Sequence, residues 1–341
     1  MSGLVSAQNA DDERQRGASM TTIAQKAGSP GARLLGVGAY RPRRRVTNAE
    51  LSTTMDTSDE WIQTRVGIAE RRWAAEDETL VEMAVAAGGK ALAAAGLTPD
   101  EVDLVVVASA SLRVPIPGIG PQVAHRLGVV RPGSFDLNAG CAGFCYALET
   151  ASNAIRVGAA RHAVVIGVER LTDVTDLTDR ATAVIFADGA GAVVLGAADE
   201  PGIGPVAWGS DGDQFPAIAI SPETRTMEMA GQSVYRWATT KLTGALEEAM
   251  ASAGVTAADI DVFVPHQANL RIVESMHKKL GFGPRTVVAR DIVVSGNTSA
   301  ASIPLALSAL LESGEAKSGD LALVFGYGAG LTFAGQVLRL P

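Results

Sequence analysis

Three polar side chains occupy positions from which they could form one site for nucleophilic catalysis, and the first is a cysteine. Cys141 lies in the run Gly140-Cys141-Ala142-Gly143, between a predicted strand, Phe135–Leu137, and an apolar, helix-like stretch. A thiol at the start of a helix lies at the positive end of the helix dipole, which lowers its pKa, and the backbone N–H groups there can stabilise an oxyanion. The glycines allow a tight turn and the close approach of a substrate. The pattern predicts a nucleophilic cysteine.

A histidine and an asparagine lie at comparable points later in the chain. His266 follows the predicted strand Asp261–Val264, next to a proline that ends strand pairing, and Asn297 lies in the loop Gly296-Asn297-Thr298-Ser299. Taken singly, a cysteine or histidine in an apolar segment is more often an ordinary core residue than a catalytic one. A functional site is favoured because all three side chains are expected to follow strands, in loops that an internal repeat makes equivalent or adjacent.

The elements that must position these residues alternate between strand and helix. Ala-rich helical stretches are predicted at Leu80–Ala95 and Thr240–Ala253, and such alternation indicates an α/β architecture. Short apolar runs predict buried strands at Val102–Ala108, Ala163–Gly167, Ala192–Gly196, Asp261–Val264 and Leu321–Gly326.

The two parts of the chain repeat each other in the same order. Ala95-Gly96-Leu97-Thr98 recurs as Ala253-Gly254-Val255-Thr256, and Ala163–Gly167 recurs as Ala322–Gly326. The segment that ends at Cys141 matches the segment that ends at Asn297, so the offsets all lie between 156 and 159 residues. The repeat predicts a duplicated chain, with an N-terminal half at 31–200 and a C-terminal half at 201–341, packed around a pseudo-twofold axis.

Composition limits the classes of protein that remain. The 341 residues are 47% hydrophobic and 19% charged, which excludes global disorder. A net charge of −8 argues against a generally basic nucleic-acid binder. Two cysteines cannot form a disulfide framework, so a cytoplasmic setting is expected. No apolar run reaches the roughly 18 residues of a membrane span, and no membrane partner is expected.

Two smaller expectations concern the N-terminus and metals. Residues 1–30 have neither a sustained apolar period nor the hydrophobic core of a signal peptide, so we expect a disordered tail there. The two cysteines and four histidines show no ligand spacing, so no metal site is expected. Cys145 lies on the same predicted helix as Cys141, and we expect it to be dispensable.

Several of these motifs resemble those of the β-ketoacyl-ACP synthase III family, from about Leu34 to Pro341. The resemblance implies a duplicated thiolase-like α/β fold, layered α-β-α-β-α, and an acyltransferase that starts fatty acid synthesis. It is carried by Asn138–Phe144, Val264–Asn269 and Gly296–Pro304, with further similarity at Asp56–Ile62 and Phe186–Ala192.

The resemblance also implies roles for the three polar residues. Cys141 would take an acyl group from acyl-CoA, while His266 and Asn297 would drive the decarboxylation of malonyl-ACP by hydrogen bonding to the thioester carbonyl. The carbanion would then attack the acyl-cysteine. Backbone N–H groups of Cys141 and Ala329 would form the oxyanion hole, although the family usually has glycine at the position of Ala329.

Substrate-contacting residues follow from the same resemblance. Trp61 would stack on the CoA adenine, with Arg180 on its other face, Arg65 near the phosphates and Asn269 close by. A partly buried structural tryptophan is the alternative for Trp61. A basic rim would attract the acidic acyl carrier protein, the alternative being an ordinary solvated helix face. The rim consists of Arg236, Arg271, Lys278 and Lys279.

The family forms homodimers, and the resemblance implies the same here. Ile116, in the loop Pro115-Ile116-Pro117, would reach toward the partner's acyl pocket and limit the starter to short acyl groups, from acetyl to about six carbons. Gly209–Thr224 is shorter than in many relatives, and Leu112–Val114 also differs from the usual pattern. Both departures bear on substrate range.

Other functions compatible with a cysteine, a histidine and an asparagine remain open at this point. A starter-unit synthase of a polyketide pathway would use the same three residues. Type III polyketide synthases share them but are usually longer, with a different C-terminal glycine loop. Papain-like hydrolases also use the trio, but this chain lacks their sequence context and they lack its duplication. A catalytically inactive partner subunit would have no reason to keep all three.

Overall fold

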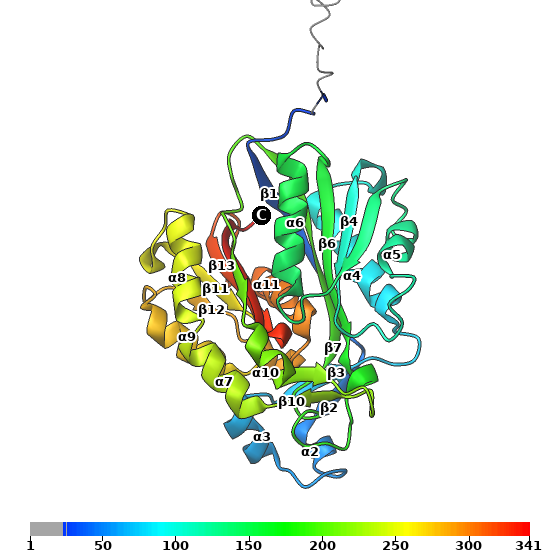
Figure 1. Ribbon diagram of the computed structural model, residues 1–341, viewed down its shortest axis with the longest axis vertical. Coiled ribbons are helices and arrows are strands. Elements are labelled where there is room, and N and C mark those ends of the chain that lie inside the picture. Colours follow the sequence, from blue (N-terminus) through cyan, green and yellow to red (C-terminus); the bar gives the residue numbers. More distant parts are fainter. Residues whose placement is uncertain (1–22, 25) are drawn as a thin grey trace, which may run out of the picture.

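Two five-stranded sheets with the same strand order form the framework of the computed structural model, which describes residues 23, 24 and 26–341 (Figure 1). The first sheet runs β1 (Gly31–Tyr40), β7 (Asp188–Ala198), β6 (His162–Arg170), β4 (Leu104–Ala108) and β5 (Gly133–Leu137). The second runs β8 (Ala207–Ser210), β14 (Thr332–Arg339), β13 (Leu321–Gly328), β11 (Val262–Pro265) and β12 (Val287–Val288).

Strand directions repeat as well as strand order. In the first sheet β4 pairs parallel with both β5 and β6, whereas β6 with β7 and β7 with β1 are antiparallel. In the second sheet β11 pairs parallel with β12 and β13, and β13–β14 and β14–β8 are antiparallel. The two halves are therefore copies of one topology, as the sequence repeat predicts.

Helices cover both sheets and fill the space between them, which gives five layers (Figure 1). On the outer face of the first sheet lie α4 (Leu80–Ala95) and α5 (Gly120–Arg126). Between the sheets lie α6 (Gly143–Arg156) and α11 (Ser302–Ser313). On the outer face of the second sheet lie α7 (Gly231–Thr240), α8 (Thr243–Ser252) and α9 (Leu270–Leu280). The layered thiolase-like α/β fold is thus confirmed.

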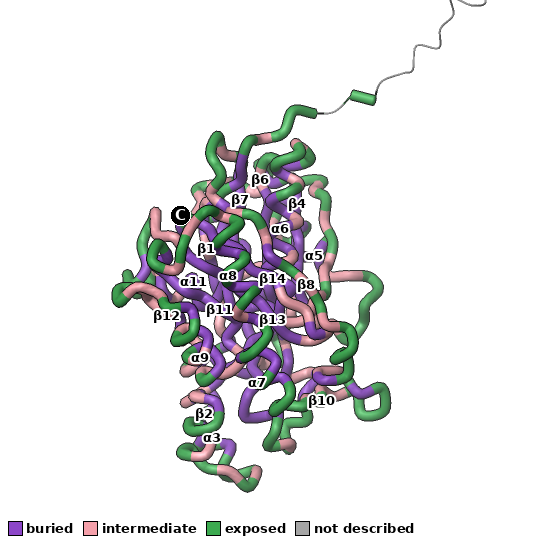
Figure 2. The backbone as a smooth tube through the Cα atoms, turned by 60° about the vertical axis from the view of Figure 1, so that its left-hand side comes forward, coloured by how far each residue is buried: buried purple, intermediate pink, exposed green. Residues whose placement is uncertain are grey.

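The central layer is the most buried part of the molecule (Figure 2). Phe144 and Leu148 on α6, and Ile303 and Leu307 on α11, pack against strands of both sheets. Each such side chain contributes about 1.5–3 kcal/mol to stability when fully buried. Glycine makes this packing close, because a Cβ on Gly167 of β6 would lie 2.3 Å from the Ala300 carbonyl oxygen.

Shorter strands and helices complete the fold outside the two five-stranded sheets and the long helices. They are the antiparallel pair β2 (Arg44–Thr47) and β3 (Glu70–Trp73), the hairpin β9 (Ile218–Ile220) and β10 (Met227–Met229), and the helices α2 (Asn48–Leu51), α3 (Asp59–Val66) and α10 (Ile292–Ser295). Short 3₁₀ helices lie at η1 (Pro99–Glu101), η2 (Leu171–Val174), η3 (Gly212–Ala217), η4 (Ala257–Asp259), η5 (Ser299–Ala301) and η6 (Ala329–Leu331).

Most predicted elements occur, with two differences. The stretch predicted as one helix from 240 to 253 is instead the end of α7 and then α8. The prediction that Asn297 directly follows a strand is wrong, because α10 intervenes. Tertiary hydrogen bonds hold this turn: Arg41 donates to the Asp291 carboxylate at 2.8 Å, and the Ile292 N–H donates to the Gln267 side chain at 3.2 Å.

Most of the predicted N-terminal tail, residues 1–22 and 25, lies outside the described residues. Nearer the fold, the Ser29 hydroxyl donates to the Ala198 carbonyl at 2.8 Å, just before β1 begins. Within residues 23, 24 and 26–341, no helix has the length and hydrophobicity needed to cross a membrane.

Candidate active site

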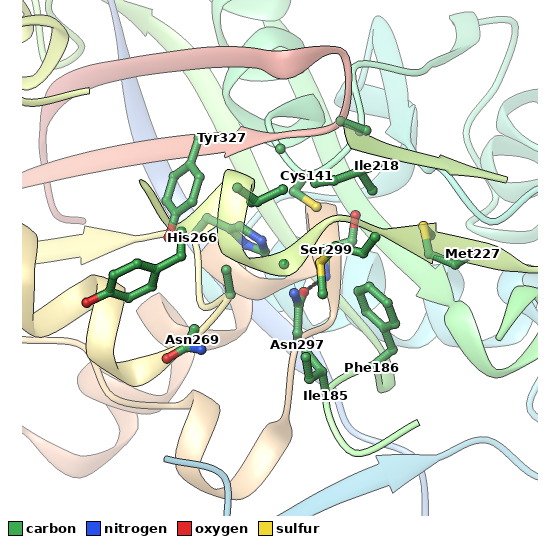
Figure 3. Close-up of a pocket in the computed structure, with 18 of the residues that line it drawn as sticks. Cys141, Ile185, Phe186, Ile218, Met227, His266, Asn269, Asn297, Ser299 and Tyr327 are labelled. Carbon is green, nitrogen blue, oxygen red and sulfur yellow. Dashed lines mark hydrogen bonds between the residues drawn. The ribbon is translucent and has the colours of Figure 1, made fainter. Parts of the chain in front are cut away.

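A cavity of about 1270 Å³ is lined by residues of both halves, and the three residues singled out from the sequence all face it (Figure 3). Figure 3 shows the Cys141 thiol, the His266 ring and the Asn297 amide directed toward the same space. They come from the β5–α6 loop, the end of β11 and the loop after α10. The duplication therefore brings a thiol from one half opposite a ring and an amide from the other.

The loop around Cys141 is shaped by glycines on both sides of the interface. Gly140 has φ 55°, a left-handed conformation that suits glycine, and its N–H donates to the Asn138 side chain at 3.1 Å. Opposite, a Cβ on Gly328 would lie 2.7 Å from the Cβ of Cys141. A larger residue at 328 would displace the thiol, so the end of β13 fits closely against the cysteine.

Burial controls the acidity of the thiol. Surrounding protein raises the pKa of Cys141 to about 11, while the Ser299 hydroxyl and the backbone N–H groups of Cys141 and Ala329 act in the opposite direction. The prediction of a lowered pKa is therefore wrong for the free protein, because desolvation outweighs the start of α6. The backbone N–H groups of Cys141 and Ala329 therefore both lie close to the sulfur.

Ala329 is held in place by Thr332, three residues further along the chain, whose hydroxyl also reaches the Cys141 loop. Thr332 donates through its hydroxyl to the Ala139 carbonyl at 3.1 Å and to the Ala329 carbonyl at 3.0 Å. Ala329 does not have a positive φ angle, so its Cβ causes no backbone strain. The alanine is compatible with a loop in which the family usually has glycine.

His266 is buried and neutral. It is 1% exposed, and burial lowers its pKa to about 3. The Ser302 hydroxyl lies 2.7 Å from Nδ1 and accepts the Gln267 N–H at 3.3 Å. With one lone pair of Ser302 taken, its proton is free to point at Nδ1, and this arrangement favours the tautomer with the proton on Nε2. Nε2–H is then available as a donor to a ligand.

The amide of Asn297 is oriented by the loop that follows it. Its Oδ1 accepts the Ser299 N–H at 2.9 Å (dashed line in Figure 3), so the Nδ2 group is left to donate to a ligand. Ser299 adopts φ 47°, an uncommon conformation for a residue with a side chain. Main-chain hydrogen bonds of 2.9 Å between Asn297 and residues 185 and 187 fix the loop to the other half.

Trp61 lines the cavity, and two arginine side chains lie close to its ring. The guanidinium of Arg180 lies 4.8 Å from the centre of the indole ring, and that of Arg65 lies 5.6 Å from it. Arg180 also donates to the Asp56 carbonyl at 2.7 Å. The arginine rests directly on the indole, so a planar ligand would enter between them only if Arg180 moved outward.

The remaining predicted contact residues divide into two groups. Asn269, Arg236 and Arg271 line the cavity, and Asn269 caps α9 while donating to the Arg65 carbonyl at 3.2 Å. Lys278 and Lys279 are exposed in the last turn of α9 and do not line the cavity. Lys279 donates to the Thr239 carbonyl. Ile116 is 84% exposed and lies outside the cavity of its own chain.

Comparison with known proteins identifies the family. The family model described as 3-Oxoacyl-[acyl-carrier-protein (ACP)] synthase III matches residues 135–212, and the model of its C-terminal region matches residues 250–340. The chain is 49% identical to β-ketoacyl-[acyl-carrier-protein] synthase III of Streptomyces glaucescens, over 94% of this chain and 100% of that protein. It belongs to the β-ketoacyl-ACP synthase III family.

Other members and solved structures agree with this membership. A mycobacterial β-ketoacyl-[acyl-carrier-protein] synthase III of Mycobacterium avium is 48% identical over 94% of this chain and 99% of its own. The priming β-ketosynthase of a polyketide biosynthetic pathway superposes with a TM-score of 0.91 at 45% identity, over 94% and 99% of the two chains. The synthase III of Aquifex aeolicus superposes with a TM-score of 0.87 at 36% identity, over 91% and 100%.

The positions of some side chains in this synthase III site could not be predicted from the sequence. Ser302 and Ser299 lie in the quoted Gly296–Pro304 motif, yet nothing local indicates that they contact His266 and Asn297. Glu169 is fully buried at the end of β6 and accepts from the hydroxyl of Ser111 at 2.6 Å and from backbone N–H groups of residues 110 and 300. Burial raises its pKa. It joins the first half to the Asn297 loop.

The sequence indicates only part of the apolar lining of the cavity. The 209–224 segment, expected to bear on substrate range, supplies Phe215 and Ile218, whereas the other apolar residues of the lining were not predicted. The apolar lining includes Ile185, Phe186, Phe215, Ile218, Met227 and Met229. No group of His, Cys, Asp or Glu within the described part of this synthase III is arranged to hold a metal ion.

Proposed function

We propose that this protein condenses a short acyl-CoA with malonyl-ACP, with loss of CO₂, through an acyl intermediate on Cys141. The observation that carries the proposal is the convergence of a thiol and two oriented N–H donors in one cavity, each from a different loop. Membership of the synthase III family adds that the reaction starts fatty acid synthesis. We expect the enzyme to act in the cytoplasm, where its two substrates are made.

In the first half-reaction Cys141 attacks the carbonyl carbon of the acyl-CoA thioester. A carbon–sulfur bond forms to Sγ, and the bond to the CoA sulfur breaks, so CoA leaves carrying the proton lost by the thiol. Because the thiol pKa is raised, the proton must leave as the substrate binds. The N–H groups of Cys141 and Ala329 would stabilise the tetrahedral oxyanion.

In the second half-reaction His266 and Asn297 act on malonyl-ACP. The Nε2–H of His266 and the Nδ2–H of Asn297 would donate to the thioester carbonyl oxygen while the carbon–carbon bond to the carboxylate breaks and CO₂ leaves. The resulting enolate carbon attacks the acyl group, and the electron pair of the broken thioester bond returns to Cys141. A neutral histidine suits this role, since it donates a hydrogen bond without adding a proton.

Two surfaces would bind the substrates outside the reaction centre. Trp61, Arg65, Arg180 and Asn269 would bind CoA, with Arg180 moving off the indole to let the adenine stack. Arg236 and Arg271 at the cavity, with Lys278 and Lys279 further along α9, would attract the acidic carrier protein. Such steering affects the association rate more than the tightness of binding.

The starter is proposed to be a short acyl group, from acetyl to about six carbons. In a homodimer, which we propose here, Ile116 would reach into the partner's pocket. Five residues of the 209–224 segment also line the cavity, so both regions contribute to selection. They are Phe215, Ile218, Ala219, Ile220 and Pro222.

Mass spectrometry of the intact protein after incubation with a panel of acyl-CoAs tests the proposal. A covalent adduct on Cys141 whose mass matches the acyl group is expected, followed by its loss when malonyl-ACP is added, with release of CO₂. The absence of an adduct with every acyl-CoA, from acetyl to octanoyl, would overturn the proposal.

Priming of a polyketide pathway is the second candidate, because the priming ketosynthase named above is 45% identical and superposes closely. The same residues would act, so the distinction lies in the substrates. Condensation rates measured with the carrier protein of fatty acid synthesis and with a polyketide carrier protein separate the two. A preference of tenfold or more for the polyketide carrier would favour priming.

A further inference from the structure

One residue of the cavity lining carries a buried hydroxyl that has no part in the reaction described above. Tyr327 lies on β13, is 1% exposed and lines the same cavity as Cys141 and His266 (Figure 3). Its ring meets the His266 ring edge-on, with centres 5.2 Å apart. Among the described residues, its hydroxyl has no hydrogen-bond partner. A hydroxyl donor is thus held beside the catalytic histidine.

Packing alone does not explain the hydroxyl. A buried polar group without a partner destabilises the folded state, whereas phenylalanine would fill the same space without that cost. Two residues earlier on the same strand face, Phe325 is fully buried and its ring lies 6.4 Å from that of Tyr327. A phenylalanine ring therefore packs on this face without a hydroxyl. We take the hydroxyl of Tyr327 to serve in binding a ligand.

The thioester oxygen of the substrate is not available to Tyr327, because it already has hydrogen-bond donors in both proposed half-reactions. During acylation these donors are the N–H groups of Cys141 and Ala329, and during decarboxylation they are His266 and Asn297. The next acceptor along the substrate is the nearest amide carbonyl of the pantetheine arm, which is separated from the sulfur by two methylene groups and the amide nitrogen. Cys141, His266 and Tyr327 line one cavity with Asn269 and Arg271, so an arm bound along this lining would bring its amide near Tyr327.

We propose that the Tyr327 hydroxyl donates a hydrogen bond to the pantetheine amide carbonyl nearest the thioester, in acyl-CoA and in the carrier protein alike. This inference rests on the proposed function. Tyr327 is then a positioning residue: it holds the arm so that the thioester carbonyl meets its donors. The burial that leaves the hydroxyl unpaired in the free enzyme makes the hydrogen bond stronger once the arm excludes water.

The test compares Tyr327→Phe with the wild type on three donors that carry the same acyl group. They are acyl-CoA, the N-acetylcysteamine thioester, which keeps the nearest amide, and an S-propyl thioester, which lacks it. We expect KM for the first two to rise about two- to tenfold, the usual effect of losing one hydrogen bond, with little change in kcat. The S-propyl thioester should react equally with both proteins.

Melting temperature separates positioning from a structural role. Tyr327→Phe should melt at the same temperature as the wild type or higher, because it removes an unpaired buried hydroxyl. The matched control is Tyr146→Phe: that hydroxyl lies 3.4 Å from the Gly209 carbonyl, its ring stacks on Trp208, and it does not line the cavity. It should leave KM unchanged for all three donors.

Each other outcome overturns the inference. An equal loss on all three donors would place the contact at the thioester or at His266, and no loss on any would mean that the hydroxyl bonds only to water. A lower melting temperature with unchanged KM would assign it a structural role. Failure of the proposed function is distinct, since the wild type itself would then form no acyl adduct.

Discussion

The two halves of the chain share one topology and differ in what they present to the cavity. The first half places a cysteine at the start of a 14-residue helix, α6, directly after a five-residue strand, β5. The second half has a two-residue strand, β12, then the short helix α10, before Asn297 is reached. It also places His266 at the end of β11, where the first half has Ser109 after β4.

The difference shows how a duplicated fold divides a reaction. A thiol needs backbone N–H groups around it, and the start of a long helix together with the end of β13 provides them. A histidine and an asparagine that donate hydrogen bonds need their other atoms occupied instead. Ser302 and the Ser299 N–H provide this, and both come from the loop and helix that follow Asn297. In the proposed mechanism the first half supplies the nucleophile, and the second half supplies the two side-chain donors used in decarboxylation.

The largest effect should come from removing the nucleophile of the first half. Cys141→Ala should form no acyl adduct with any acyl-CoA, because no other thiol reaches the cavity. Cys145→Ala is the control, since Cys145 is fully buried on α6 and does not line the cavity. It should retain acylation, as measured by intact mass. An adduct that maps to Cys145 would reverse the assignment.

The pH dependence of the thiol comes next in size. With the pKa raised to about 11, the thiolate fraction of Cys141 rises about tenfold for each pH unit below that value. Alkylation by iodoacetamide should therefore speed up about 1000-fold between pH 7 and pH 10. A rate that levels off near pH 7 would indicate that the helix start dominates over burial. Cys141→Ala supplies the background rate.

Removing the donors of the second half should separate the half-reactions. His266→Ala and Asn297→Ala should each lower CO₂ release from malonyl-ACP by about 10²–10³-fold, the usual effect of losing an oxyanion-hole hydrogen bond. Acylation of Cys141 should continue in both, because its donors are backbone groups. Normal CO₂ release would contradict the division between the halves, and so would a matching loss of acylation.

A smaller effect is expected from the residue that orients the histidine. Ser302→Ala removes the partner of Nδ1 and should slow decarboxylation about 10- to 100-fold, the range for a buried group left unpaired. Ser308→Ala is the control: it is buried on the same helix and donates to Glu312 at 2.6 Å, away from the cavity. If both variants behave alike, Ser302 acts on packing and not on the tautomer.

The smallest effects should concern acyl length. Ile116→Ala should admit longer acyl groups and Ile116→Phe should narrow the preference toward acetyl-CoA, by about tenfold per methylene, the lower end for apolar pockets. Phe215→Ala tests the same property within one chain. If the profile of kcat/KM against acyl length changes only in Phe215→Ala, the 209–224 segment selects the acyl group and Ile116 does not. That conclusion holds whether light scattering finds a monomer or a dimer.

Much of the fold could be predicted because its signals are local. The apolar runs of β4, β6, β7, β11 and β13, and the helix at Leu80–Ala95, are visible in short windows of sequence. The conformation of the segment before Asn297 could not be predicted from the sequence. Its Ile-Val-Val run resembles a strand, but Arg41 and Gln267 stabilise a helical turn there. Residues 250 and 25 positions away along the chain decide that conformation.

By itself the sequence determined which reactive groups are present: a cysteine between glycines, a histidine after a proline, and an asparagine in the matching loop. Its duplication implied that these groups share one cavity. Tertiary structure alone decided how those groups behave. Burial, which depends on both halves at once, raises the pKa of the Cys141 thiol and keeps His266 neutral. Ser302, 36 residues beyond His266, favours its tautomer. Arg180 rests on Trp61, and Tyr327, a residue of the cavity lining, keeps a buried hydroxyl without a partner, because packing between distant segments sets both surroundings.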